Sequence, residues 1–282
     1  MTLESALRQG SRLLEEAGIP APRLTAEVLL CHALGRERSY LYGHPEEELA
    51  RNPWIHFGRY LHERLNGKPT QYITRVQEFY GRNFRVTPDV LIPRPETEHV
   101  VETALRVAPE ARRILDIGCG SGAIAVTLQL ETGAAVFATD ISAAAVAVAR
   151  RNADALGAKV GFAVCDVASA LAPGSLDLIV SNPPYIPLDE EPGLQREIRD
   201  YEPRTALYPG PTGLELYERI IAGAPDLLRR GGWLIVETGY RQADPVRALL
   251  SGRCWGDVET VHDLAGLPRV VAARCWGPPG AG

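Results

Sequence analysis

The chain has 282 residues, a formal net charge of −5 and a hydrophobic fraction of 45%. This length suffices for one large domain and a small one. The negative charge argues against a protein that grips a long stretch of duplex DNA, because such binding relies on neutralising phosphates. No apolar run approaches the roughly 18 residues needed to cross a membrane. The charged N-terminal residues do not resemble a signal peptide, so we expect a cytoplasmic protein.

The cysteines and histidines give no sign of a metal site. The five cysteines form no Cys-x-x-Cys pair, and no two histidines have the spacing of metal ligands. Because the number of cysteines is odd and their spacing irregular, we expect neither a disulfide framework nor a bound zinc ion. We therefore expect a metal-free protein.

Helical patterns dominate the start of the chain. Residues 2–17 predict a helix, and a second helix is expected to begin near Pro22. Asn52 and Pro53 read as an N-cap followed by a proline at the first helical position. Apolar residues then recur at helical spacing as far as Leu65. The first seventy or so residues are thus expected to form a small helical unit.

The pattern changes after this helical unit. Residues 78–92 alternate apolar and polar side chains, which predicts a pair of strands. The segment 93–98 has prolines followed by acidic residues, as is typical of the first turn of a helix. We expect that helix to continue to Val107.

From residue 112 onward, apolar strands alternate with helices. We expect strands at 112–118, 135–140, 160–166, 175–184 and 233–239, and helices at 123–131, 142–157 and 216–232. This alternation predicts a mostly parallel sheet with right-handed crossovers. Ligands of such sheets bind at the carboxyl ends of the strands. The long segment from Pro192 to Pro211 lies beyond one such end and is expected to cover a site there.

A glycine-rich loop follows the first of these strands. Residues 116–122, with the sequence DIGCGSG, join the strand to a helix, where glycines let the backbone approach a ligand closely. Asp140 ends the next strand, and its carboxylate can accept hydrogen bonds from both hydroxyls of a ribose. The loop alone also fits a dinucleotide site or a purely structural turn. Asp116 favours a cationic ligand such as a sulfonium, because it would repel a pyrophosphate.

The sequence Asn-Pro-Pro-Tyr at 182–185 is the most specific feature of the chain. The prolines lack an N–H and restrict the preceding residues, so this is a stiff turn rich in hydrogen-bond acceptors. An amide nitrogen is a poor nucleophile because its lone pair is delocalised. The side-chain oxygen of Asn182 and the backbone oxygen of Pro183 can hold the two N–H bonds of such a group, while Tyr185 stacks on its plane. Proximity to an activated methyl donor would then supply much of the rate.

Six segments of the chain resemble those of one known family, and in the same order. They are GKPTQYI at 67–73, EFYG at 78–81, LIPRPETE at 91–98, DIGCGSG at 116–122, SNPPYI at 181–186 and YEPRTAL at 201–207. With these segments the chain resembles the release factor glutamine methyltransferases, the PrmC/HemK family, within the N6-adenine and N5-glutamine methyltransferase superfamily. The combination of LIPRPETE with NPPY is specific, because the related ribosomal-protein glutamine methyltransferases are expected to differ in PRPETE.

The resemblance implies an α/β fold with a seven-stranded, Rossmann-like class I methyltransferase sheet. It implies an N-terminal helical substrate-recognition domain at 1–77, a β-hairpin linker at 78–92 and an S-adenosylmethionine-dependent methyltransferase domain at 93–282. The activity implied is transfer of a methyl group to the glutamine of the Gly-Gly-Gln loop in class I peptide-chain release factors. No membrane or nucleic-acid partner is implied.

The resemblance also assigns roles to residues. The cofactor is expected to contact Gly118, Cys119, Gly120, Ser121, Gly122, Asp140, Asp166, Val167 and Asn182. The substrate glutamine is expected to contact Asn182, Pro183, Pro184, Tyr185 and Arg94, with Asn182, Pro183 and Tyr185 as the catalytic residues. Family members often carry an aromatic residue where Val167 stands, so the resemblance does not imply adenine packing on an aromatic ring at this position. Glu96 and Glu98 are candidates for shaping the substrate entrance, whereas we expect Glu237 and His262 to be structural.

Two other functions remain open from the sequence. A DNA adenine N6-methyltransferase would use the same Asn-Pro-Pro-Tyr chemistry on an exocyclic amine, although we find no basic target-recognition domain for a flipped base. A non-catalytic module that binds the cofactor or a translation factor is disfavoured by the intact glycine loop and Asn-Pro-Pro-Tyr sequence. Methylation of DNA, or cofactor binding without transfer, would distinguish these alternatives.

Overall fold

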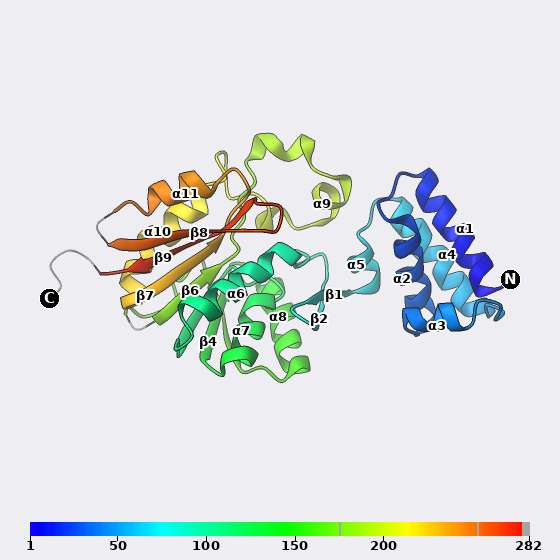
Figure 1. Ribbon diagram of the computed structural model, residues 1–282, viewed down its shortest axis with the longest axis horizontal. Helices are drawn as coiled ribbons and strands as arrows, with labels where there is room; N and C mark the ends of the chain where they lie inside the picture. The colour runs from blue at the N-terminus through cyan, green and yellow to red at the C-terminus, as the bar shows by residue number, and fades with distance from the viewer. Residues whose placement is uncertain (175, 253, 278–282) are drawn as a thin grey trace. The chain divides into compact units, whose positions relative to one another are not determined.

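The computed structural model describes residues 1–174, 176–252 and 254–277, which divide into two compact units (Figure 1). The first comprises Met1–Val76 together with Gln195–Tyr201, and the second comprises Gln77–Leu194 and Glu202–Gly282. The chain therefore passes between the units three times. No helix among the described residues is long and apolar enough to cross a membrane.

The first unit is helical. Its helices are α1 (Leu3–Glu16), α2 (Pro22–Leu34), α3 (Arg38–Gly43), α4 (Arg51–Leu65), α5 (Thr70–Thr74) and α9 (Arg196–Tyr201). Thr2 caps α1 by accepting a hydrogen bond from the Ser5 backbone N–H. At Gly10 a Cβ atom would lie 2.6 Å from the ring of Phe57, so the absence of a side chain lets α1 and α4 approach closely.

Helix α4 begins earlier than the sequence indicates. Its N-cap is Ala50 and its first residue is Arg51, so the prediction that Asn52 caps the helix is wrong. Pro53 is still accommodated, because the first turn of a helix leaves its N–H groups without intrahelical partners. Proline in this turn therefore marks the start of a helix only to within about a turn.

A hairpin of β1 (Val76–Phe79) and β2 (Arg82–Arg85) stands at the start of the second unit, with Val76 still in the first. A strand pair was predicted over 78–92, but the observed pair begins two residues earlier and ends at Arg85. Phe79 and Phe84 pack edge to face in the core. The buried side chain of Asn152 accepts a hydrogen bond from the Arg85 N–H and donates to the Arg85 and Ser121 carbonyls. This single amide thus ties the hairpin to the loop that opens α7.

The main sheet has seven strands in the order β5-β4-β3-β6-β7-β9-β8, which confirms the expected class I methyltransferase architecture. The pairs β3–β4, β3–β6, β4–β5 and β6–β7 are parallel, whereas β9 pairs antiparallel with both β7 and β8. The strands are β3 (Arg113–Ile117), β4 (Ala135–Asp140), β5 (Val160–Val164), β6 (Leu176–Ser181), β7 (Leu228–Glu237), β8 (Trp255–His262) and β9 (Pro268–Cys275). Ser175, where a strand was predicted to begin, lies outside the described residues.

Helices cover both faces of the sheet (Figure 1). One core contains residues of α6 (Glu98–Val107), α7 (Ala123–Thr132) and α8 (Ala143–Leu156), and the other contains residues of α10 (Glu215–Leu227) and α11 (Ala243–Leu249). Short 3-10 helices lie at η1 (Pro95–Thr97), η2 (Leu188–Gly193) and η3 (Arg204–Ala206). Because strands β3, β4 and β6 are buried between these layers, a ligand can reach them only at their ends, and in sheets of this kind ligands bind at the carboxyl ends.

The boundary between α10 and β7 differs from the prediction. The helix ends at Leu227, and the strand begins at Leu228, five residues before the predicted Trp233. Leu228 is buried and pairs with Leu176, and the register shifts beyond that pair. The packing of Leu228 thus determines that this segment is a strand, because its glycines favour neither helix nor strand.

Candidate active site

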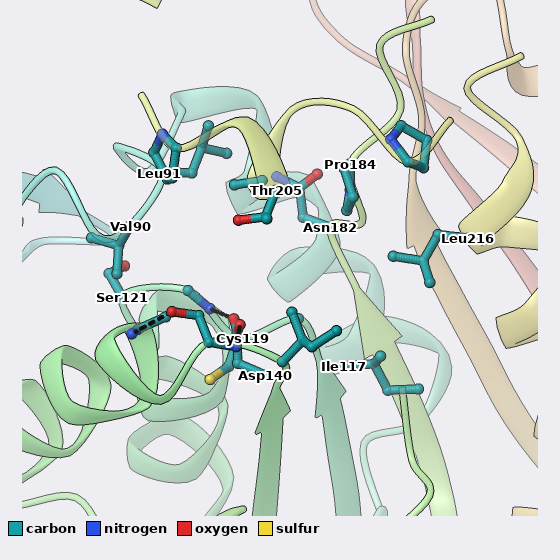
Figure 2. A pocket seen from close by; sticks show the side chains of 18 of the residues that line it. Val90, Leu91, Ile117, Cys119, Ser121, Asp140, Asn182, Pro184, Thr205 and Leu216 are labelled. Atoms are coloured by element: carbon teal, nitrogen blue, oxygen red, sulfur yellow. Dashed lines mark hydrogen bonds between the residues drawn. The ribbon is translucent and has the colours of Figure 1, made fainter. Parts of the chain in front are cut away.

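A cavity of about 340 Å³ opens at the carboxyl ends of β3, β4 and β6 (Figure 2). It brings together three of the predicted elements: the glycine loop after β3, Asp140 at the end of β4, and Asn182 just after β6. In Figure 2, Asn182 and Thr205 lie on one side of the view, and Cys119 and Asp140 lie on the other. The volume falls within the range of small-molecule sites.

The glycine loop adopts a backbone that favours glycine. The φ angles of Gly118, Gly120 and Gly122 are 74°, 52° and 82°. A Cβ added to Gly118 or Gly120 would meet open space, whereas one on Gly122 would lie 3.1 Å from the Cβ of Ala149. The first two glycines therefore keep backbone close to the cavity, and the third permits close packing of α7 on α8.

Asp140 is held by the backbone around it. Its carboxylate accepts hydrogen bonds of 2.9 Å from the N–H groups of Gly120 and Ser142. Burial raises the pKa of this carboxyl, and those backbone donors oppose the shift. The side chain is thus fixed in place at the cavity wall.

Asp116 has a different place from the one we expected. It is fully buried, and its carboxyl accepts a hydrogen bond from the Ala125 N–H. It is not among the described residues that line the cavity. Burial raises its pKa to about 7. The residue therefore satisfies a backbone donor in the first turn of α7, and its effect on a cationic ligand would be exerted through the protein interior.

Asp166 and Val167 line the cavity after β5. Asp166 pairs with Arg219 at 2.7 Å across the cavity wall. Val167 has a φ of 53°, and its carbonyl accepts a 2.6 Å hydrogen bond from the Thr139 hydroxyl. This bond holds the left-handed conformation, which a β-branched residue rarely adopts.

The Asn-Pro-Pro-Tyr segment divides between the cavity and the core. Asn182 and Pro184 line the cavity, while Pro183 and Tyr185 do not belong to its described lining. Pro183 is buried, and Tyr185 packs against the α10–α11 core, where burial raises the pKa of its hydroxyl. The Tyr185 carbonyl accepts a 2.7 Å hydrogen bond from the Gln242 side chain. The turn is therefore anchored beneath the site.

The charged residues of the PRPETE segment are occupied elsewhere. Arg94 pairs with the buried carboxylate of Glu202 at 2.5 Å. Glu96 lies 3.7 Å from Arg269, and the Glu98 carboxylate accepts a hydrogen bond from the hairpin backbone. None of the three belongs to the described lining of the cavity. Two uncharged residues of this segment, Pro93 and Thr97, do line it.

Part of the long segment after β6 covers the cavity. The lining includes Pro203, Thr205, Ala206, Tyr208 and Pro209. This agrees with the expectation that residues between Pro192 and Pro211 lie over the site. By contrast, 195–201 belongs to the helical unit, which no pattern in the sequence indicates.

Sequence reasoning missed two residues next to Asn182. Thr97 is 4% exposed and accepts a 3.1 Å hydrogen bond from the Asn182 side-chain amide. Glu237, 3% exposed at the end of β7, has its carboxyl next to the Thr97 hydroxyl, which lowers the pKa of that carboxyl. A buried acid at a strand's carboxyl end was the available signal. The described residues contain no group of acids, histidines and cysteines arranged to hold a metal ion.

Two family models match the chain. The PrmC N-terminal domain matches residues 5–74, and the methyltransferase small domain matches residues 97–193. Among curated relatives, the release factor glutamine methyltransferase of Koribacter versatilis is 45% identical over 97% of this chain and 99% of its own length. The protein of the same name from Nitratidesulfovibrio vulgaris is 45% identical over 97% of this chain and 95% of its length.

Solved structures support the fold. A methyltransferase from Pyrococcus furiosus matches 78% of this chain and all of its own, with a TM-score of 0.55 at 18% identity. A T. Thermophilus 16S rRNA methyltransferase, solved with AdoMet and guanosine, matches 71% of this chain and 49% of its own, with a TM-score of 0.51 at 21% identity. At these identities the likeness extends to the fold alone.

Proposed function

The chain belongs to the release factor glutamine methyltransferase family, and from this membership we propose that it methylates the side-chain amide nitrogen, N5, of the glutamine in the Gly-Gly-Gln loop of class I release factors. S-Adenosylmethionine is the methyl donor. The observation that carries the proposal is that Asn182 shares one cavity with the glycine loop and Asp140. A substrate from the translation machinery also implies a cytoplasmic place of action.

The residues around the cavity fit the cofactor. Gly118 and Gly120 leave open space where a Cβ would stand, and Asp140 presents a fixed carboxylate beside them. We assign the methionine part to the glycine loop, the ribose to Asp140, and the adenine to the region of Asp166 and Val167. When bound, S-adenosylmethionine supplies the methyl group as an already activated sulfonium electrophile.

The protein's task is then to orient and desolvate the amide. In our proposal the side-chain oxygen of Asn182 and the backbone oxygen of Pro183 each accept a hydrogen bond from one N–H of the substrate amide. These two acceptors favour the positive charge that develops on the nitrogen during transfer. Tyr185 limits water near the site and supports the turn. Arg94 acts on the substrate entrance through Glu202 and the segment that follows it. Holding the nucleophile in place supplies much of the rate.

The test is a methyl-transfer assay with labelled cofactor, a class I release factor, and the same factor with its loop glutamine replaced. We expect label on the first protein and none on the second. Label on both would contradict the assigned acceptor atom. Label only on a ribosomal protein, or only on duplex DNA, would overturn the substrate while leaving amide or amine methylation intact.

A further inference from the structure

Asn182 is hydrogen-bonded to Thr97 at the cavity, and the buried carboxyl of Glu237 lies next to Thr97 in the core. The Asn182 amide nitrogen lies 3.1 Å from the Thr97 hydroxyl oxygen. That hydroxyl faces the Glu237 carboxyl and lowers its pKa. The three residues come from different parts of the sequence: the turn after β6, the end of η1 and the end of β7. Only Asn182 and Thr97 line the cavity.

The direction of these bonds follows from the chemistry of the groups. An ionised carboxylate can only accept hydrogen bonds, so Glu237 requires the single proton of the Thr97 hydroxyl. The hydroxyl oxygen is then left as an acceptor, and it can be satisfied only by the NH₂ side of the Asn182 amide. The amide oxygen must therefore point away from Thr97. Without such partners, the oxygen and the NH₂ group of an asparagine amide could exchange places by a half-turn of the side chain.

Burial makes this arrangement difficult to replace with hydrogen bonds to water. Thr97 and Glu237 are 4% and 3% exposed, so water cannot readily replace either partner. One oxygen of the Glu237 carboxyl, Oε2, is buried and has no hydrogen-bond partner among the described residues. Burial raises the Glu237 pKa to about 7, while the Thr97 hydroxyl opposes that shift. At pH 8 the carboxyl is therefore mainly ionised and acts as an acceptor.

We propose that Glu237 and Thr97 are positioning residues, which fix the Asn182 amide so that its oxygen, and not its NH₂ group, meets the substrate amide. The inference rests on the proposed function of the site and deepens it. A reversed Asn182 would present donors to the donors of the substrate NH₂ group, and methyl transfer would fail without any loss of cofactor binding. The expected specificity is for ligands that bring N–H donors to this point.

The first experiment compares Thr97→Val, which keeps the shape but removes the hydroxyl, with Thr97→Ser, which restores it. At pH 8 we expect Thr97→Val to lower kcat 10- to 100-fold, with the cofactor Kd within twofold and the substrate KM within threefold of wild type. Thr97→Ser should retain kcat within threefold. Glu237→Gln should give an intermediate loss, because a glutamine does not oblige Thr97 to donate.

Thr103→Val is the matched control. Thr103 is 2% exposed in α6 and does not belong to the described lining of the cavity. It should lose as much stability as Thr97→Val while keeping kcat within twofold. Equal losses of kcat in the two variants would mean a general structural effect and would overturn the inference. So would Thr97→Val with kcat within threefold of wild type.

A second readout needs no substrate. Hydrogen exchange of the Asn182 side-chain NH₂ group, followed by NMR and assigned with Asn182→Ala, should be at least tenfold faster in Thr97→Val than in wild type. Unchanged exchange would overturn the inference whatever the substrate. If wild type labels no release factor, the proposed function fails, while the exchange result still decides whether Thr97 holds Asn182.

Discussion

Asp140 accepts a 2.9 Å hydrogen bond from the backbone N–H of Gly120, so the carboxylate at the end of β4 also holds the loop at the end of β3. Two strands that are neighbours in the sheet are thereby joined at the cavity. Loss of this carboxylate would loosen the glycine loop and also remove the contact that we propose for the ribose.

We therefore predict that Asp140→Ala raises the S-adenosylmethionine Kd at least tenfold, as measured by titration calorimetry. Asp140→Asn should be less damaging, because its oxygen can still accept the Gly120 bond. Asp244→Asn, an exposed change on α11, serves as the control and should leave the Kd within twofold. A Kd for Asp140→Ala within threefold of wild type would refute the role given to Asp140.

Asn182→Ala should separate binding from transfer. We expect cofactor affinity to stay within a few-fold of wild type, while single-turnover methyl transfer falls by about 10- to 100-fold, because a lost acceptor in a desolvated site costs on the order of 1–3 kcal/mol. The two quantities are measured by calorimetry and by label incorporation. Near-normal transfer by this variant would rule out the mechanism.

The buried carboxyl of Asp116 should make stability depend on pH. Its folded-state pKa of about 7 lies above the usual value, so the folded protein keeps a proton that the unfolded chain releases. Stability from this group is intact below about pH 4 and is lost as the pH rises toward 7. Asp116→Asn should remove this component, so its free energy of unfolding should fall less over that range.

This comparison requires denaturant unfolding of the cofactor-free protein at several pH values. Between pH 4 and pH 8, the free energy of unfolding of Asp116→Asn should rise relative to that of wild type by on the order of 3–4 kcal/mol. Parallel curves for the two proteins would show that Asp116 does not titrate in this range.

Asn152→Ala should destabilise the catalytic unit. The side chain makes three hydrogen bonds to backbone atoms of Arg85 and Ser121, and it is 2% exposed. We expect a loss of about 2–4 kcal/mol in the free energy of unfolding, because buried backbone groups are left without partners. The exposed Asp154→Ala on the same helix should change it by less than about 0.5 kcal/mol. A similar small change for Asn152→Ala would contradict the anchoring role.

Local patterns in the sequence predicted most of the fold. The strand–loop–helix alternation after residue 112 is confirmed, and a hairpin is present near the predicted place, although it spans 76–85 rather than 78–92. Periodicity and turn chemistry act over a few residues, which is why they could be predicted. Errors arose where distant packing decides. Leu228 joins β7 because it pairs with Leu176, and α4 starts at Arg51 although Asn52 is the better capping residue.

The site was predictable to the extent that its residues lie at strand ends. Asp140 and Asn182 line one cavity, as the topology requires. The sequence could not indicate that Asp116 turns toward α7, or that Glu237 reaches Thr97, because those facts depend on side-chain direction across separate elements. The charge of the acidic residues in PRPETE made them the candidates in this segment, yet it is the uncharged Thr97 that is hydrogen-bonded to Asn182.

Segment 195–201 has a consequence for how such proteins can recombine. Arg64 of α4 is only 6% exposed and forms a 2.7 Å ion pair with Glu197, and the Tyr201 hydroxyl donates to the Asn66 carbonyl. A chimaera joined at residue 77 would therefore inherit one part of its helical unit from each parent. Mismatched parents would leave Arg64 buried without its acid. Exchange of the helical unit between such proteins thus requires three junctions, two more than a single joint at residue 77.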